Sequence, residues 1–352
     1  RNRGRAMSLW GATAGAAMLV GPVLGGVIVE HIGWQWIFLV NIPVGIIGLI
    51  LAWLWVPNLE THSHTFDWLG VFLSLVAVSL LTFGIQEGET YNWGRINQWL
   101  SVPLLLGLGV VFLALFVFWQ SRNKREPLVP LTLFSDRNFA INSTAVAAVS
   151  FTVLAFPFPF MLWAQQAKGW SPAVSGMLIV PMAVLSIALA DPVGRMIDRG
   201  DPKKLTIMGF AISVVAMTLM ALAIRANVGY VTMLGVVALL GLGNAFLWSP
   251  LSTNAVFNLP MSLAGAGSGV YNTMRQFGSV IGSAAIAAAI TSRVAAHLPE
   301  FQGITSESSD LALPAEHADA FSVAMSEALY LVIAAYLVGL TLVLFIKPRP
   351  PR

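Results

Sequence analysis

The sequence contains no cysteine and few charged residues, and each shortage excludes a class of protein. Without cysteine the chain cannot form disulfides, bind zinc through thiolates or use a thiol nucleophile. Charged residues make up 10% of the 352 residues, whereas soluble domains carry roughly 25%. Hydrophobic residues make up 57%, and the mean hydropathy is +0.78. This composition indicates an integral membrane protein, and the long apolar stretches described below predict that it is all-α.

Histidines and phosphate-binding motifs are also scarce. Among the five histidines only His62 and His64 lie close together in sequence, and we interpret this pair as part of an ordinary loop. The sequence has no Gly-x-x-x-x-Gly-Lys-Ser/Thr run that would bind ATP phosphates. We therefore expect no metal and no cofactor, and an ion gradient as the energy source for any transport.

Long apolar stretches recur along the chain at the length that a membrane crossing requires. A helix needs about 20 apolar residues to cross about 30 Å of hydrocarbon. Two prolines, Pro157 and Pro159, predict a bend in one of these stretches. Ten stretches qualify, and the predicted spans are 7–28, 36–56, 67–86, 99–119, 139–163, 173–190, 205–224, 229–249, 266–290 and 327–346.

Basic residues gather on alternate connections between the predicted spans. If the N-terminus is cytoplasmic, the outside holds only Arg95, Lys168, Arg225 and Arg293 of the 19 lysines and arginines. The positive-inside rule then predicts that both termini are cytoplasmic. This placement accounts for the pI near 9.4. No loop has the basic run interleaved with aromatic residues that nucleic-acid binding requires, so we expect no nucleic-acid partner.

The first predicted span contains a dense group of small residues. Gly15, Gly21, Gly25 and Gly26 lack side chains that would hold a neighbouring helix away, so two backbones can approach closely. Pro22 removes a backbone donor and bends the helix, which lipid tolerates only where neighbouring helices cover the freed carbonyl. We therefore expect this span to lie at a crowded helix interface.

A charged motif follows the sixth predicted span and includes Gly194, Arg195, Asp198 and Arg199. We expect Asp198 to lie beside the N-terminus of the next helix, where the helix dipole favours an anion. A charge cluster of this kind can latch one helix end to another and separate when the helices move apart. The alternative is that the charges only satisfy the positive-inside topology. We favour the latch for these four residues and the topological role for the two lysines that follow.

Three groups of residues resemble the major facilitator superfamily. The Gly-Pro-Val-Leu-Gly-Gly stretch at 21–26 looks like its antiporter motif, and residues 194–199 look like its cytoplasmic loop signature. Four connecting phrases resemble, in their order and spacing, its 14-span drug:proton antiporter branch of the EmrB/QacA type. The phrases lie at 38–45, 66–70, 126–131 and 272–278. This resemblance implies the major facilitator fold, with about ten transmembrane helices of an expected fourteen.

The resemblance also implies a domain organisation. Residues 1–56 would form the last two spans of the N-terminal bundle, and 57–138 would form two linker spans with their cytoplasmic connections. Residues 139–352 would form the C-terminal six-helix bundle. The chain would then correspond to spans five to fourteen. Because it opens directly on a basic segment at Arg1, we expect it to begin within a larger protein.

Polar residues inside the predicted spans are candidates to line a transport pathway near the bilayer midplane. Each is costly in lipid and tends to face the interior of a helix bundle. The amides could instead hydrogen-bond across a helix interface. The candidates for binding substrate or for coupling are Asn41, Asn142, Asp191, Asn244, Asn272, Arg275 and Gln276.

Two of these candidates carry charge. Arg275 cannot carry a proton because its guanidinium stays charged at any relevant pH. It either pairs across the bundle with a polar or acidic partner or extends from the nearby inner helix end to the headgroups. Asp191 is the best-placed carboxylate for proton coupling, but it could equally cap the segment around Gly194. Asp67 is expected to cap the helix that follows it.

The resemblance implies a secondary active transporter that exports lipophilic or cationic drugs across the cytoplasmic membrane by proton-coupled antiport. An exporter of an endogenous metabolite or lipid is the alternative within transport. A multi-pass membrane enzyme would need paired carboxylates or a metal site in a sizeable loop, and a scaffold would need an added soluble domain. We find neither in the sequence and therefore expect no enzyme. Expected partners are a small-molecule substrate, protons and the lipid bilayer, with the protein as a monomer.

Overall fold

The computed structural model describes residues 25, 28, 32–33, 35–55, 66–88, 91, 93–123, 127–299 and 313–347. The predicted span at 7–28 thus lies outside the described residues, except for Gly25 and Ile28. Within the described ranges the regular secondary structure is helical, apart from one isolated bridge between Arg95 and Ser101, and turns or irregular segments connect the helices. Nine helical segments in these ranges are long and apolar enough to cross a membrane.

These nine segments follow the order of the remaining predicted spans. Several of them combine two or three helices separated by a bend. The helices are α2 (Gln35–Leu39), α3 (Asn41–Trp55), α4 (Trp68–Gln86), α5 (Val102–Arg122), η1 (Leu131–Ser135), α6 (Arg137–Ala155), α7 (Pro157–Leu162), η2 (Trp163–Ala167), α8 (Pro172–Met177), α9 (Val180–Arg199), α10 (Pro202–Arg225), α11 (Tyr230–Ala245), α12 (Trp248–Val256), α13 (Met261–His297), η4 (Ala315–His317) and α14 (Ala318–Leu344).

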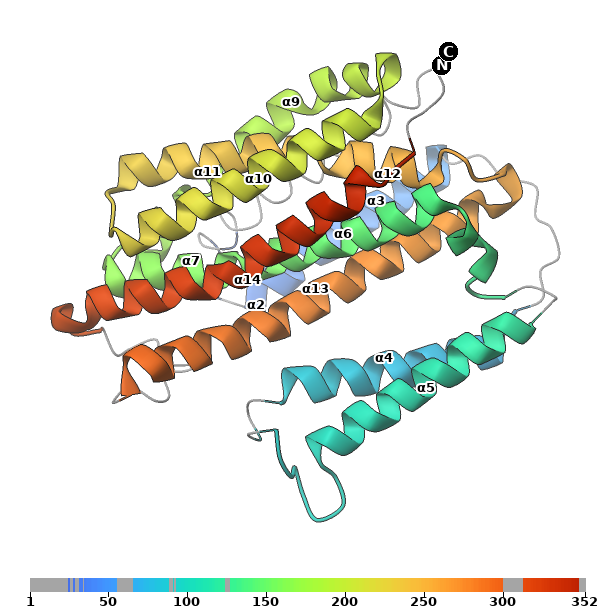
Figure 1. Ribbon diagram of the computed structural model, residues 1–352, viewed down its shortest axis with the longest axis horizontal. Coiled ribbons are helices and arrows are strands. Elements are labelled where there is room, and N and C mark those ends of the chain that lie inside the picture. Colours follow the sequence, from blue (N-terminus) through green and yellow to red (C-terminus); the bar gives the residue numbers. More distant parts are fainter. Residues whose placement is uncertain are drawn as a thin grey trace.

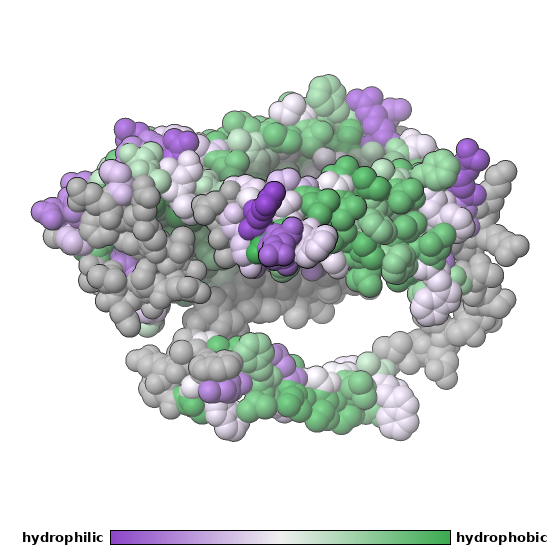
Figure 2. Space-filling view, turned by 90° about the horizontal axis from the view of Figure 1, so that it is seen from below, coloured by the Kyte–Doolittle hydropathy of each residue, from purple (hydrophilic) through white to green (hydrophobic). Residues whose placement is uncertain are grey.

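Helices α6 to α14 pack into one bundle, while α4 and α5 form a separate hairpin that lies below it in the view of Figure 1. Within the bundle α13 and α14 both pack along α6, and α10 packs between α11 and α14. The largest fully buried side chains, such as Trp163, Phe210 and Tyr336, lie in this bundle. Figure 2 shows apolar residues along the helices, and hydrophilic residues toward both ends and in one patch near the middle.

The closest helix approach in the bundle joins α6 to α13 at two glycines. A Cβ at Gly278 would overlap the backbone of Ala147, and one at Gly282 would overlap the backbone of Phe151. Because both pairs advance together along the chain, the two helices run parallel. The spacing is the small-xxx-small pattern that lets membrane helices pack backbone to backbone. At Gly25, where the sequence predicts such packing, no described residue lies within 4 Å of the Cβ position.

The two prolines interrupt the span that begins at α6, as predicted. Helix α6 ends one residue before Phe156, α7 begins at Pro157, and the π-helical turn η2 follows at Trp163. Phe156, Phe160 and Trp163 are buried in the main core of the bundle. These aromatic residues therefore fill space between helices at the bend.

Several helices extend beyond the predicted spans. Helix α9 continues nine residues past the predicted end at 190, α13 begins at Met261, and α14 begins at Ala318. Hydropathy identifies the part of a helix that suits lipid, whereas the helix itself continues wherever packing supports it. Polar residues lower the hydropathy at the start of α14, yet Phe321 and Met325 are buried there.

One end of the bundle is tied together by hydrogen bonds to the last residues of the described chain. Asn138 Nδ2 donates to the Lys347 carbonyl at 3.1 Å, and Lys347 N donates to Asn138 Oδ1 at 2.9 Å. Lys203 Nζ donates to the Ile346 carbonyl at 2.6 Å. These bonds connect the starts of α6 and α10 to the end of α14. We call this end of the bundle, which also carries Arg137 and Arg199, the basic end.

Candidate functional site

Helix α13 carries a polar face that is exposed over three turns. Ser268, Asn272, Thr273 and Gln276 are all exposed there, and their spacing places them along one side of the helix. Such a face is costly in hydrocarbon, so it must meet protein or water. Two sequence-predicted candidates, Asn272 and Gln276, lie on this face. Among the described residues, Asn272 Nδ2 donates to the Ser268 carbonyl of its own helix, at 3.0 Å.

Arg275 lies beside this polar face and is partly buried. Its Nε is buried and makes no hydrogen bond to a described residue. The same is true of the hydroxyl of Tyr271, one turn earlier on α13. Two neighbouring polar groups without hydrogen-bond partners cost free energy in an apolar environment. The pair is therefore a natural place for a further polar group or water to bind.

The depth of Arg275 follows from the parallel packing of α6 and α13. Arg275 lies three residues before Gly278, which meets Ala147, so it is level with Thr144 on α6. Helix α6 begins seven residues earlier, at Arg137, which is about 10 Å away at 1.5 Å per residue. Arg275 is also fourteen residues from the start of α13, rather than a few residues from the helix end as expected. This depth favours a partner inside the protein over extension to the headgroups.

The other two buried candidates belong to the interior of the bundle. Asn142 Nδ2 donates to the Asn138 carbonyl at 2.7 Å, within α6. Asn244 lies in a buried polar cluster in which it, Ser213 and Thr152 surround the hydroxyl of Tyr336. These side chains come from four different helices. The structure therefore places Asn142 and Asn244 between packed helices and away from the exposed polar face.

Asn41 is not brought close to the other candidates in the described part of the chain. It is the first residue of α3, it is exposed, and its Nδ2 donates to the Ile37 carbonyl in α2 at 3.1 Å. No side chain of α3 is buried. Asn41 therefore stabilises the junction between α2 and α3.

The charged motif at 194–199 forms the last turns of α9, so the expectation that Asp191 caps the segment around Gly194 is wrong. Asp191 caps no helix, because α9 continues through Pro192; it pairs instead with Arg195 one turn later, and both are largely exposed. Asp198 also lies inside α9. The residue at the next helix N-terminus is Asp201, whose Oδ1 accepts a hydrogen bond from Lys203 N at 3.0 Å. Pro192 suggests an early helix end, but membrane helices tolerate proline.

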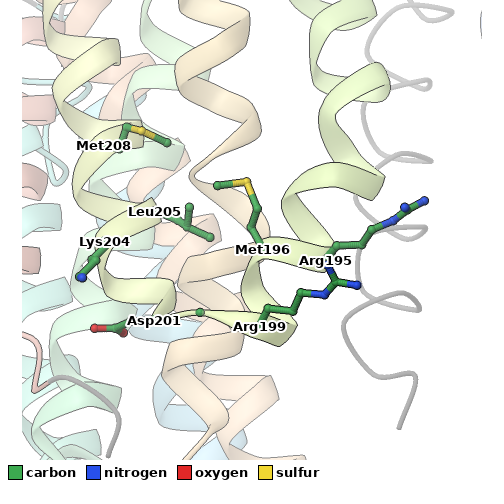
Figure 3. A pocket seen from close by; sticks show the side chains of 8 residues that line it. Arg195, Met196, Arg199, Asp201, Lys204, Leu205 and Met208 are labelled. Atoms are coloured by element: carbon green, nitrogen blue, oxygen red, sulfur yellow. The ribbon is translucent and has the colours of Figure 1, made fainter. Parts of the chain in front are cut away.

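A cavity of about 470 Å³ lies between the end of α9 and the start of α10. Figure 3 shows Met196, Leu205 and Met208 on its walls, with Arg199 and Asp201 close to the turn that joins the two helices. The complete lining consists of Arg195, Met196, Arg199, Gly200, Asp201, Lys204, Leu205 and Met208. The cavity thus combines apolar walls with three cations and one carboxylate.

Asp67 is the centre of a polar cluster that the sequence predicts only in part. It caps α4 as expected, accepting a hydrogen bond from Gly70 N at 2.9 Å. It also accepts hydrogen bonds from Trp119 Nε1 at 2.8 Å, Gln120 Nε2 at 2.8 Å and Leu128 N at 3.3 Å. Partial burial alone would raise the pKa of this carboxyl, but the four hydrogen bonds outweigh it and lower the pKa to about 2.

A second charged cluster lies at the end of the bundle opposite to the basic end. Glu327 Oε2 is 3.1 Å from His297 Nε2 and 3.4 Å from Arg293 Nη1, so one carboxylate joins α14 to the last turns of α13. In the same region Lys168 Nζ donates to the Asn227 carbonyl at 2.9 Å. These contacts connect helix ends and loops, and they leave the polar face of α13 as the best candidate for a transport pathway.

The nine long apolar helical segments in the described ranges indicate a multi-pass α-helical membrane protein. Residues 1–283 match the family described as Major Facilitator Superfamily. The chain belongs to the Major Facilitator Superfamily.

Three relatives are similar to most of this chain. The "Uncharacterized MFS-type transporter Rv1250" of Mycobacterium tuberculosis is 40% identical over 349 residues, which is 98% of this chain and 59% of the relative. "Multidrug resistance protein Stp" of the same species is 29% identical over 300 residues, 85% of this chain and 54% of Stp. MdtD of Escherichia coli, whose name also refers to multidrug resistance, is 31% identical over 265 residues, 75% of this chain and 55% of MdtD. The chain spans little more than half the length of these relatives.

Proposed function

We propose that the protein containing this chain is a secondary active transporter that exports lipophilic or cationic compounds in exchange for protons. The observation that carries this proposal is the exposed polar face of α13 with Arg275 beside it, about 10 Å inside the bundle. A polar face at this depth is typical of a helix that lines a pathway. Membership of the family and the names of Stp and MdtD support an efflux function.

In this proposal the bundle of α6 to α14 is one of two rigid bodies that rock around a central cavity. It corresponds to residues 139–352, with 1–56 contributing to the other bundle and 57–138 linking them. The basic end lies in the cytoplasm, as the distribution of arginine and lysine favours. The close glycine packing of α6 against α13 supports movement of the bundle as a unit, because such contacts have little freedom to slide.

Arg275 supplies a fixed positive charge on the pathway. A carboxylate on a facing helix would be held ionised by this charge, and its protonation would release the contact. The motif of Gly194, Arg195, Asp198 and Arg199 acts as a latch at the basic end in the same cycle. No ion pair joins Asp198 to another described residue, which leaves its carboxylate available to a partner on the other bundle.

The role of Arg275 can be tested by comparing the export rate of the full-length protein with that of its Arg275→Leu variant. We expect export to fall by about thirtyfold or more, because removing one partner of a buried charge pair costs about 2 kcal/mol or more. The matched control is Arg293→Gln, an exposed arginine on the same helix. Dye export from cells is measured at equal amounts of protein in the membrane. Normal export by the Arg275→Leu protein would refute its role.

The test of proton coupling is export in the presence of a protonophore. We expect export to stop when the proton gradient collapses, and to resume when a gradient is imposed on inside-out vesicles. Continued export without a gradient would refute antiport. Competition only by metabolites or lipids, and none by lipophilic cations, would favour the alternative substrate class.

A further inference from the structure

Three aromatic rings meet at the end of the bundle opposite to the basic end. Trp163 begins η2, Trp170 lies in the loop that follows, and Tyr230 begins α11. The ring centroids of Trp163 and Trp170 are 5.5 Å apart, with an angle of 84° between the ring planes. Those of Trp170 and Tyr230 are 5.3 Å apart at 77°. Neighbouring rings thus stand nearly at right angles, and we call the three of them the aromatic cage.

The side chain of Lys168 occupies the corner between the two indoles. Its Nζ lies 5.8 Å from the ring centroid of Trp163 and 5.7 Å from that of Trp170. Both distances are within the limit of about 6 Å at which the face of an indole attracts an ammonium group. Nζ also donates to the Asn227 carbonyl at 2.9 Å. Two aromatic faces and one carbonyl therefore hold the ammonium.

The backbone around the aromatic cage is held by contacts that do not involve the lysine side chain. Lys168 N donates to the Trp163 carbonyl, and Trp170 N donates to the Ala164 carbonyl, each at 3.1 Å. The Trp163 ring is fully buried in the core of the bundle. The Lys168 side chain, by contrast, is only partly buried, and its stem is flexible. Its ammonium can therefore leave while the rings keep their positions.

The burial of Trp163 favours a role for its aromatic face. Its Nε1 is buried and makes no hydrogen bond to a described residue. An unpaired buried donor costs free energy, and a phenylalanine at this position would avoid that cost. Complete burial also separates Trp163 from the aromatic residues that anchor membrane proteins at the headgroups. Because tryptophan attracts cations more strongly than phenylalanine or tyrosine, cation binding accounts for an indole here.

We infer that the aromatic cage binds an alkylated ammonium ion, which takes the place of the Lys168 side chain. Aromatic cages recognise quaternary ammonium groups through the attraction that holds Lys168 here. Beyond the Asn227 carbonyl, Asn227 Nδ2 donates to Asp319 Oδ1 at 3.4 Å, so an exposed carboxylate adds negative charge near the site. Lys168 is then an intramolecular competitor. The inference goes beyond the proposed export function, because binding at the cage does not require transport.

The test measures binding of radiolabelled tetramethylammonium to the purified full-length protein in maltoside micelles. Lys168→Ala should tighten binding about tenfold, because two ring contacts keep the cage filled in most molecules and lower the apparent affinity by the open fraction. Lys168→Arg keeps a cation in the cage and should bind like the unmodified protein. The matched control Arg225→Ala removes an exposed cation at the same end of the bundle and should change the affinity by less than about twofold.

Replacing one ring separates binding in the cage from a general attraction of cations. The double variant Lys168→Ala and Trp170→Leu should bind tetramethylammonium about tenfold more weakly than Lys168→Ala alone. Trp170→Phe in the same background retains a weaker aromatic face, so it should give an intermediate affinity and keeps the test decisive if leucine disturbs folding. Unchanged affinity in Lys168→Ala, equal tightening in Arg225→Ala, or no effect of either ring substitution would overturn the inference.

Two competition experiments identify the ligand more closely. Choline should displace tetramethylammonium from the Lys168→Ala protein, whereas the uncharged carbon analogue of choline should not. Equal displacement by the uncharged analogue would overturn the inference in favour of a purely apolar site. In nanodiscs, weaker tetramethylammonium binding with phosphatidylcholine than with phosphatidylglycerol would identify a lipid headgroup as the occupant. Equal binding in the two lipids would identify a free ammonium compound, and both of these results support the aromatic cage.

Discussion

Asp67→Asn should loosen the connection between the α4–α5 hairpin and the chain that leads into α6. Asp67 accepts four hydrogen bonds, from Gly70, Trp119, Gln120 and Leu128. An asparagine retains one acceptor oxygen and presents an NH₂ group to the other donors. Gln120 cannot turn its amide to compensate without losing the bond in which its Oε1 accepts from Val129 N at 3.0 Å. The substitution therefore leaves at least one donor unpaired.

The size of the effect follows from the pKa of Asp67, which is lowered from 3.8 to about 2. Since a shift of one pKa unit corresponds to about 1.36 kcal/mol, the lowered pKa corresponds to about 2.4 kcal/mol of stabilisation by the ionised carboxylate. Asp67 is partly accessible to solvent, so screening reduces this to about 1 to 2 kcal/mol. Because the folded-state pKa is lowered, the contribution is complete above pH 3.8 and is lost as the pH falls through about 2. It should therefore not change between neutral and mildly acidic pH.

Hydrogen exchange of the amides at Leu128 and Val129 measures this connection directly. A loss of about 1 to 2 kcal/mol in local stability should speed their exchange about five- to thirtyfold. The matched control is Ser101→Ala, which removes the N-cap of α5 but no contact between segments. That variant should speed exchange only near Leu104. Unchanged exchange at Leu128 and Val129 in the Asp67→Asn protein would refute the reasoning.

Three further substitutions test the packing. Gly278→Ala should lower the free energy of unfolding in a detergent unfolding assay by about 1 to 3 kcal/mol, because its methyl group would overlap Ala147. The control Gly269→Ala has open space at its Cβ and should not lower the free energy of unfolding in this way. Gly70→Ala should disrupt the Asp67 cluster and lower the melting temperature, unlike the uncrowded Gly107→Ala. Asn138→Ala should free the Lys347 amide, costing about 2 kcal/mol for two hydrogen bonds, and exchange at Lys347 should rise.

The sequence predicts the membrane spans well because length and apolarity act locally. Nine of the ten predicted spans correspond to helical segments in the described ranges, and the cap at Asp67 also follows from local residues. Trp119 and Leu128 meet Asp67 from 52 and 61 residues away. That convergence depends on how α4, α5 and the following chain pack, which no local pattern reveals.

The errors have equally physical origins. Pro192 and the charged residues after it suggest a helix end and a cap at Asp191, whereas α9 continues to Arg199. The glycine contact of α13 has a visible signal, Gly-Ser-Val-Ile-Gly at 278–282, but the sequence contains many glycines and does not say which of them meet a neighbour. For the pathway candidates the sequence supplies polarity and depth, and only the fold separates exposed Asn272 from buried Asn244.

Helix α13 is much longer than the membrane layer that it crosses. It has 37 residues and is about 55 Å long, almost twice the thickness of the hydrocarbon layer. Gly278 lies beside its midpoint, where the contact with α6 fixes the helix to the bundle. Both ends of α13 therefore follow any rotation of the bundle, and a rotation of about 10° around this point would move each end by about 5 Å in opposite directions. One rigid movement would thus displace the region of Arg275 together with both membrane surfaces.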